Sequence, residues 1–356
     1  MRFVVFSDLH LHEWVYGSRI VNGRNSRLEQ QVRVVHDIVN YCKSEGISEA
    51  VLTGDVFHTS TVSAAVSEAA YRAFSEFNRA GIHLTIVPGN HDQATRTGEL
   101  DSLSWFSTIG TVARCGDSGV DRICQTGDVQ AYGIPFTHDR GELARRIDQI
   151  PSGCRLLYLH QGVSGVEINS KGFTLNEALT PDMIPPWIGM AFTGHYHSAK
   201  QVTDNLVIPG STVQLNWGDK DERRGWLDVD YNPEDNTTAI THMEAKASKF
   251  VQADDVSGLD GYAVEGNFLR VVTEDNTPSF VQSLVEDLYK RGAESVEIKN
   301  VIQVDNAIKL QTTQFNSLNE IIYAYAHEKE RAGVIDEYDR LVGEQLLKGN
   351  YQVPNA

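Results

Sequence analysis

The chain has 356 residues and a formal net charge of −17 at neutral pH. This length is greater than one hydrophobic core usually serves, so it predicts one large domain and a smaller one. The acidic balance argues against a protein that grips nucleic acid unaided, because neutralising phosphates requires Lys and Arg. A nucleic-acid enzyme is still possible, since bound metal ions or a basic partner can supply the positive charge.

The sequence contains no feature of a membrane or secreted protein. No apolar run is long enough to cross a bilayer. The first residues enter a predicted strand directly, without the basic and apolar regions of a secretory signal. The cysteines form no closely spaced pair, so we interpret them as reduced thiols and expect a cytoplasmic protein. They are Cys42, Cys115, Cys124 and Cys154.

Strands and helices alternate over the first ninety residues. Apolar residues at helical spacing predict one helix from about Leu28 to Ser44 and another from Ser63 to Arg79. The segment 12–25 is predicted to be irregular, because it contains Gly17 and Gly23. Short apolar runs before, between and after the helices predict strands, and together they indicate a parallel βαβαβ unit.

The rest of the chain completes one large domain and adds smaller parts. Residues 111–136 predict short strands, 142–149 a helix, 169–186 an irregular insertion, and 205–208 and 225–231 two more strands. These elements complete an α/β domain over residues 1–245. A small α/β capping domain is predicted over 246–312, with strands at 268–272 and 295–302 and a helix at 279–290. The terminal segment 313–356 predicts two helices, 315–331 and 334–348, broken at Gly333.

Five apolar runs end in residues that can bind a metal ion. The runs are Phe3–His10, Ala50–Asp55, Leu84–Asp92, Leu156–His160 and Met190–His197. Ligands of open α/β sheets gather outside the carboxyl ends of the strands, so we expect these polar ends to converge. A single Asp or His at a strand end is more often a cap or a surface residue, and the interpretation depends on all five together. The candidate ligands are Asp8, His10, Asp55, Asn90, His160, His195 and His197.

The chemistry of this set indicates transition-metal ions. Two carboxylates, one amide oxygen and four imidazoles suit Mn²⁺, Fe²⁺ or Zn²⁺ better than Mg²⁺ or Ca²⁺, which prefer oxygen alone. Seven ligands are too many for one ion with an open position, and they suit two ions about 3.5–4 Å apart that share a carboxylate. Asp55 stands alone at its strand end and is the natural bridge.

These motifs resemble a known signature. The series Asp8-x-His10, Gly54-Asp55, Gly89-Asn90-His91-Asp92, His160 and Gly194-His195-x-His197 resembles that of the calcineurin-like binuclear metallophosphoesterases, over about residues 1–215. Within that superfamily the chain is most similar to the SbcD / meiotic-recombination-11 type of DNA repair nuclease subunit. The narrower likeness rests on Ser7-Asp8-Leu9-His10-Leu11, Gly54-Asp55-Val56-Phe57-His58 and His160-Gln161-Gly162. The short chain is similar to the compact subunits that some phages encode, which would place it in the host cytoplasm.

The resemblance implies a fold and two ligand sets. The fold would be a four-layer αββα sandwich of two sheets flanked by helices, with the capping domain and C-terminal helices added. The two sets would be Asp8, His10, Asp55 and His197 for one ion, and Asp55, Asn90, His160 and His195 for the other. Together the ions would hydrolyse a phosphodiester.

The resemblance also implies catalytic and substrate-binding residues. His91 would act as the general acid for the leaving alkoxide, and Asp92 would orient it. His58 would lie near the scissile phosphate, or else be a structural histidine at a helix entry. His12 stands where the family usually has glycine. Arg19, Arg24 and Arg27 could contact a DNA backbone, although ordinary solvated charges are the plainer interpretation.

The function implied is a Mn²⁺-dependent DNA nuclease subunit with 3′→5′ exonuclease and single-strand endonuclease activity. It would act with an SbcC-type coiled-coil ATPase in recombination and double-strand break processing, as a homodimer within a heterotetramer. The C-terminal helices would either bind that ATPase or pack on the cap. One alternative is another binuclear phosphoesterase, acting on cyclic nucleotides or phosphoproteins. The other is a non-catalytic scaffold, which usually loses some ligands, and here none is missing.

Overall fold

The computed structural model describes residues 1–300 except 96, 97, 99, 113–124, 168–177, 255–258, 260 and 276. The chain divides into two compact units, Met1–Asn300 and Val301–Ala356. The second unit, and with it the predicted helices 315–331 and 334–348, lies outside the described residues. Within the described part, no helix combines the length and the apolar character that a membrane crossing requires.

The first sheet has six strands and carries three of the five polar strand ends. Its order is β14-β13-β1-β4-β5-β6. The parallel part confirms the predicted βαβαβ unit, and two antiparallel strands extend it at one edge. The strands are β1 (Arg2–Phe6), β4 (Glu49–Leu52), β5 (His83–Ile86), β6 (Thr111–Val112), β13 (Gly225–Asn232) and β14 (Thr237–Glu244).

The second sheet also has six strands and carries the other two polar strand ends. Its order is β11-β12-β10-β9-β8-β7, with a parallel centre and one antiparallel strand at each edge. The strands are β7 (Gln125–Thr126), β8 (Val129–Ile134), β9 (Leu156–His160), β10 (Met190–Gly194), β11 (Lys200–Thr203) and β12 (Leu206–Ile208).

Side-chain caps determine where the helices of the sandwich begin. Helix α1 (Ser26–Glu45) starts after Asn25, whose side chain accepts hydrogen bonds from two backbone amides of the first turn. Helix α2 (Ala64–Arg79) starts after Ser63, and α3 (Arg140–Asp148) after Asp139, in the same way. The described part of the sandwich also contains the short 3₁₀ turns η1 (Ser104–Thr108), η2 (Pro181–Met183) and η3 (Trp217–Asp219).

The segment before α1 is more regular than predicted. It contains a small hairpin of β2 (Ile20–Val21) and β3 (Arg24–Asn25), which pair in antiparallel register. The prediction of an irregular loop was therefore wrong in part, because the turn at Asn22 and Gly23, both with positive φ, brings the two short strands together.

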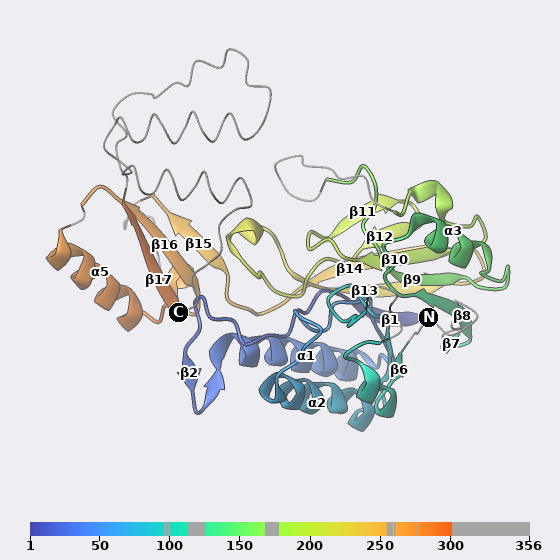
Figure 1. The fold of residues 1–356 in the computed structure, drawn as a ribbon, viewed down its shortest axis with the longest axis horizontal. Coiled ribbons are helices and arrows are strands. Elements are labelled where there is room, and N and C mark those ends of the chain that lie inside the picture. The colour runs from blue at the N-terminus through green and yellow to red at the C-terminus, as the bar shows by residue number, and fades with distance from the viewer. Residues whose placement is uncertain are drawn as a thin grey trace, which may run out of the picture. The chain divides into compact units, whose positions relative to one another are not determined.

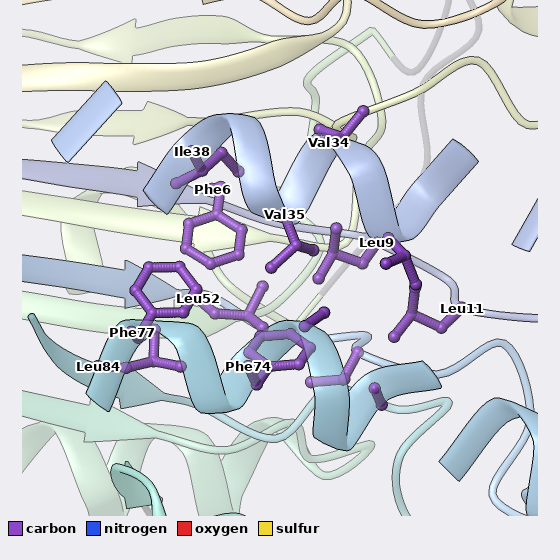
Figure 2. Packing of buried hydrophobic residues seen from close by; sticks show 14 of the residues in the cluster. Phe6, Leu9, Leu11, Val34, Val35, Ile38, Leu52, Phe74, Phe77 and Leu84 are labelled. Carbon is purple, nitrogen blue, oxygen red and sulfur yellow. The ribbon is translucent and has the colours of Figure 1, made fainter. Parts of the chain in front are cut away.

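Three hydrophobic clusters separate four layers, which confirms the predicted αββα sandwich. Helices α1 and α2 lie together beside the first sheet (Figure 1) and bury their apolar faces on it. Figure 2 shows Phe77 beside Phe6, and their rings stack with centroids 6.0 Å apart. Helix α3 covers the second sheet through Leu143 and Ile147. The third cluster lies between the two sheets, where Phe3 meets Phe192 edge-on.

A third sheet follows the sandwich and has its own core. Its three strands are parallel, and Leu284 and Leu288 of α5 pack on Leu269 and Val271. The elements are β15 (Phe250–Ala253), α4 (Gly261–Val264), β16 (Phe268–Thr273), α5 (Pro278–Lys290) and β17 (Ser295–Asn300). This sheet occupies most of the predicted cap. Because it lies within the first compact unit, the boundary at residue 246 and the capping role stay predictions.

Replacing Phe192 by alanine tests the packing between the sheets. Its side chain is fully buried, so we expect Phe192→Ala to lower the free energy of unfolding by about 3–5 kcal/mol. Urea denaturation followed by circular dichroism measures the change. The control is Leu100→Ala, because Leu100 is 64% exposed and its loss should change stability by no more than about 0.5 kcal/mol. Equal midpoints for both variants would contradict this account of the core.

Candidate metal centre

All seven predicted ligands lie at the carboxyl ends of central strands. Asp8 and His10 follow β1, and Asp55 follows β4. Asn90 comes from the loop after β5, so the first sheet supplies four of the seven. The second sheet supplies the other three: His160 ends β9, and His195 and His197 follow β10. The site therefore exists only because the two sheets pack against each other.

The first predicted set surrounds the Nε2 atom of His10. This atom lies 3.2 Å from Nε2 of His197, 3.9 Å from Oδ1 of Asp8 and 3.6 Å from Oδ2 of Asp55. Asp8, His10 and Asp55 are almost completely buried, and His197 is partly exposed. Two carboxylates and two imidazole nitrogens thus face one small volume, as ligands of one divalent ion would.

The second predicted set shares Asp55 with the first. Nε2 of His160 lies 3.3 Å from Oδ2 of Asp55 and 3.2 Å from Oδ1 of Asn90. Nδ1 of His195 lies 3.0 Å from the same Asn90 oxygen. Oδ2 of Asp55 therefore lies within 3.6 Å of a histidine nitrogen from each set. This is the position that a bridging carboxylate requires.

Hydrogen bonds around the site fix which ring nitrogens face inward. Nδ1 of His160 donates to the Thr53 carbonyl at 2.6 Å, so Nε2 is the nitrogen that faces Asp55. The backbone N–H of His91 donates to Oδ1 of Asp55 at 2.9 Å, which leaves Oδ2 for an ion. The backbone N–H of His195 donates to the carboxylate of Asp8.

The backbone at the site has positive φ angles, which residues other than glycine rarely adopt. Asp8, Asp55 and His195 have φ of 51°, 51° and 96°. His10 is similar, at 48°. Non-glycine residues in this region cost of order 1–3 kcal/mol each, and they persist where surrounding structure or function requires them. Four of the seven candidate ligands share this feature, so the strain is concentrated at the predicted site.

Two glycines allow the ends of neighbouring strands to approach each other closely at the site. Gly54 has φ of 100°, and a Cβ atom there would overlap the ring of His160. A Cβ atom on Gly89 would overlap the carboxylate of Asp55. Gly54 and Gly89, which precede Asp55 and Asn90 in the sequence motifs, are therefore required because any larger residue would collide with a candidate ligand.

Burial and charge shift the pKa values of several candidate ligands. Burial raises the pKa of Asp8 and lowers that of His10. Burial also lowers the pKa of His195 to about 3. For His160, burial opposes protonation, but the Asp55 carboxylate outweighs it and raises the pKa to about 9. A divalent cation would compensate both buried carboxylates and use the neutral imidazoles as ligands.

The residues present fit two divalent ions of the Mn²⁺, Fe²⁺ or Zn²⁺ kind. The donor set is mixed nitrogen and oxygen, its carboxylates are buried, and its inward nitrogens are oriented by hydrogen bonds from outside. Among the described residues, Asp8, His10 and His197 form one group that could hold an ion, and Asp8, Asp55 and His160 form another. Which of the seven side chains bind each ion stays a prediction.

The two histidines predicted to act on substrate lie side by side next to His10. The rings of His58 and His91 stack with centroids 5.4 Å apart and planes at 14°. Nδ1 of His91 donates to the His58 carbonyl at 2.7 Å, so Nε2 is the nitrogen left for a substrate. Nδ1 of His58 lies 3.4 Å from Nδ1 of His10. Ligand atoms of these three residues also lie within 4.8 Å of one another.

Asp92 does not orient His91, which corrects the prediction. Its carboxylate is fully buried and accepts hydrogen bonds from the backbone amides of Gly89, Phe57 and Val56, at 2.9, 3.0 and 3.3 Å. The His91 ring is oriented instead by the His58 carbonyl. Asp92 therefore ties the Asp55 loop to the Asn90 loop, and burial raises its pKa to about 7.

The three arginines predicted near the substrate have other contacts. Arg19 pairs with Glu294 at 2.5 Å, and Arg24 pairs with Glu29 at 3.3 Å. Both remain partly exposed, so their contacts with DNA stay predictions. Arg27 is 4% exposed and donates to the carbonyls of Tyr16 and Leu215. It is therefore neither a solvated charge nor a surface contact for DNA.

Sequence reasoning missed one residue that supports the strained ligand loop. Gln31 of α1 is buried, and its Nε2 donates to the carbonyls of Leu9 and His10 at 2.7 and 2.8 Å. The sequence did contain a clue to this role, because Gln31 is a polar residue on the apolar stripe of α1 that contains Leu28 and Val35. A polar side chain on such a stripe needs a buried partner, and here the partner is the metal loop.

A sandwich of two sheets with Asp, Asn and His side chains at the strand ends defines a metal-dependent hydrolase of the binuclear type. Residues 1–244 match the calcineurin-like phosphoesterase family, so the chain belongs to that family. It is a metal-dependent phosphoester hydrolase.

Two solved structures are similar to the chain at low identity. One is a dimetal phosphatase from Danio rerio, at 10% identity and a TM-score of 0.40, covering 64% of this chain and 92% of the other. The other is the phosphopantetheinyl hydrolase from Mycobacterium tuberculosis, at 12% identity and a TM-score of 0.31, covering 59% of this chain and 89% of the other.

Metal analysis of two variants tests the shared carboxylate. Asp55→Ala removes the ligand common to both sets, so we expect loss of both ions and of hydrolysis of bis(p-nitrophenyl) phosphate. His160→Ala removes a ligand of one set and should leave about one ion per chain. Elemental analysis after gel filtration in Mn²⁺ measures the content, and His36→Ala, which removes a histidine of α1 that pairs with Glu76 of α2, serves as the control. A fully active wild type holding a single ion would refute the binuclear site.

Proposed function

We propose that this phosphoesterase is a Mn²⁺-dependent DNA nuclease of the SbcD / meiotic-recombination-11 type. The main support is the stacked pair of His58 and His91 beside the candidate ligand His10. Asp55 and His58 belong to one short motif, which places a second imidazole next to His91. Such a pair suits a substrate whose leaving oxygen is a poor leaving group, as in a DNA backbone.

The choice of Mn²⁺ comes from the resemblance to the nucleases, and the ligands are compatible with it. Four imidazoles disfavour Mg²⁺, whereas Mn²⁺, like Fe²⁺ and Zn²⁺, accepts both oxygen and nitrogen. When bound, the ions supply Lewis-acid stabilisation of the phosphoryl oxygens and lower the pKa of water. The side chains Asp8, His10, Asp55 and His197 would hold one ion. Asp55, Asn90, His160 and His195 would hold the other.

The protein's own contribution to the chemistry lies in His91. Its Nδ1–H is engaged by the His58 carbonyl, so the ring has one orientation and presents Nε2. From there a protonated Nε2 gives its proton to the leaving oxygen of the cleaved strand. His58 maintains this geometry with its carbonyl and its stacked ring. The role assigned to His91 is that of general acid.

The variant His91→Ser separates chemistry from binding. We expect it to keep its metal content and DNA affinity and to lose about 10²–10⁴-fold in turnover on DNA, the range for general acid catalysis. Steady-state cleavage of labelled single strands and of recessed 3′ ends measures the loss. His36→Ser, which removes a histidine that contacts Glu76 away from the site, is the control. A variant with near-normal turnover would reduce His91 to a structural residue.

A substrate comparison tests the proposed activity against its rivals. Wild-type protein in Mn²⁺ is offered DNA, cyclic nucleotides and a phosphopeptide. The proposal expects turnover on DNA to exceed that on the other two substrates. Preference for a cyclic nucleotide or a phosphopeptide would favour another phosphoesterase activity. Absence of metal-dependent turnover on any phosphoester would favour a non-catalytic scaffold.

We also propose that the nuclease works with an SbcC-type coiled-coil ATPase, as a homodimer within a heterotetramer. The acidic charge of −17 supports this, because a partner that grips DNA would compensate for the scarcity of basic residues. Segment 313–356, outside the described residues, carries apolar residues at helical spacing and is the proposed docking segment.

Deleting residues 313–356 tests this docking. The shortened protein should still fold, bind Mn²⁺ and cleave DNA slowly, and it should no longer retain the ATPase in a pull-down. Thermal melting of the shortened protein is the control for folding. Retained ATPase would refute the docking role, whereas loss of folding would show that the segment packs on its own chain.

A further inference from the structure

Trp14 lies between the histidine pair and a buried arginine. Its ring centroid is 4.5 Å from that of His58, with the planes at 42°. The guanidinium carbon of Arg27 lies 4.8 Å from the same ring. The Trp14 carbonyl accepts a hydrogen bond from Asn25, the residue that caps α1. Asn25 thus holds the Trp14 backbone, and Arg27 of α1 packs on its ring. The same helix supports the His10 loop through Gln31.

Arg27 connects this ring to the third sheet. Its guanidinium carbon lies 5.0 Å from the ring of Phe268 and 5.6 Å from that of Phe250. These residues belong to β16 and β15. Two hydrogen bonds to backbone carbonyls fix the guanidinium plane. Among the described salt bridges, none involves Arg27, so the aromatic rings and carbonyls surround its buried charge.

The loop before α1 is also fastened directly to the third sheet. The Tyr16 hydroxyl donates to Glu297 of β17 at 2.7 Å, and the Trp217 indole donates to Tyr16 at 2.9 Å. The loop that carries Trp14 therefore follows the position of the third sheet. At its other end, Trp14 contacts His58, whose carbonyl and ring hold His91.

We propose that Trp14 and Arg27 are positioning residues that place the His58–His91 pair according to the third sheet. The series of contacts runs from Phe250 and Phe268 through Arg27 and Trp14 to His58. A sheet that shifts relative to the sandwich would thereby move the proton donor and change the rate of leaving-group departure. The inference rests on the proposed role of His91 as general acid, and not on DNA being the substrate.

The dependence of rate on the leaving group distinguishes positioning from support of the fold. A phosphodiester that releases p-nitrophenolate needs little help from an acid, because that anion is stable. One that releases phenolate or an alkoxide needs the proton. A misplaced His91 should therefore slow the poor leaving groups selectively. A general loss of fold or metal should slow every substrate alike.

The experiment compares full-length Mn²⁺-loaded wild type with Trp14→Ala, Trp14→Phe and Arg27→Met. Turnover is measured on aryl phosphodiesters with leaving groups from p-nitrophenolate to phenolate. Trp14→Ala should lose about 10–100-fold on the phenyl ester, a partial loss of the roughly 10²–10⁴-fold that acid catalysis supplies, and about threefold at most on the nitrophenyl ester. Trp14→Phe should restore most of the loss, and Arg27→Met should show the same selectivity as Trp14→Ala. Tyr71→Ala, which removes a half-exposed aromatic ring of α2, is the matched control.

Two further measurements allow the proposal to be overturned. Metal content and melting temperature should match the wild type in Trp14→Phe. In a His91→Ser background, Trp14→Ala should add almost no further loss on the phenyl ester, because both changes act on one step. An equal loss on all leaving groups, an additive loss in the double variant, or no loss in Trp14→Ala would refute positioning. Wild-type protein that hydrolyses the aryl esters but not DNA would refute the proposed nuclease and leave this test valid.

Discussion

The structure depends on the approach of two histidine nitrogens to one carboxylate oxygen, Oδ2 of Asp55. His10 reaches it from the first sheet and His160 from the second, at 3.6 and 3.3 Å. So close an approach leaves no room for a Cβ atom at Gly54 or Gly89 and holds four candidate ligands at positive φ. The protein tolerates this local cost because buried hydrogen bonds donated by Gln31 and accepted by Asp92 and the Thr53 carbonyl fix the loops in place.

The cooperation of the two sheets explains where the core must be rigid. The ligands after β9 and β10 keep their place only if the cluster around Phe192 and Phe3 holds the sheets in one register. A shift of about 1 Å would separate His160 from Asp55 enough to weaken a shared ion, since positioning errors of that size already impair active sites. Core packing and metal binding are for this reason coupled, and each stabilises the other when ions bind the folded state alone.

The sequence predicted the gathering of the seven side chains because each of five buried strands ends in a polar residue, and the resemblance carried by those residues implied the sandwich. A polar residue at the end of an apolar run can be recognised within one strand, without knowing which strands lie next to it in the sheet. The edge strand β14 and the short β15 were missed, since β14 mixes Thr, His and Glu with its apolar residues and β15 has only four residues, so neither contains a long apolar run. The roles of Asp92, Gln31 and Arg27 were also missed or misjudged. Each depends on a backbone carbonyl, an amide or a ring from a distant segment, and no motif spacing encodes such contacts.

The charges of the site and of the whole chain imply an order of events. Without ions, the site contains the buried side chains of Asp8 and Asp55 in a chain of net charge −17, which disfavours the approach of an anionic phosphoester. Two divalent ions outweigh the two carboxylates and reverse the sign of the local field. Burial favours the neutral forms of His10 and His195. The Asp55 carboxylate lies against the one histidine of the set whose pKa is raised, His160. Bound ions would therefore supply most of the attraction for an anionic phosphoester, and affinity for the substrate would follow metal loading.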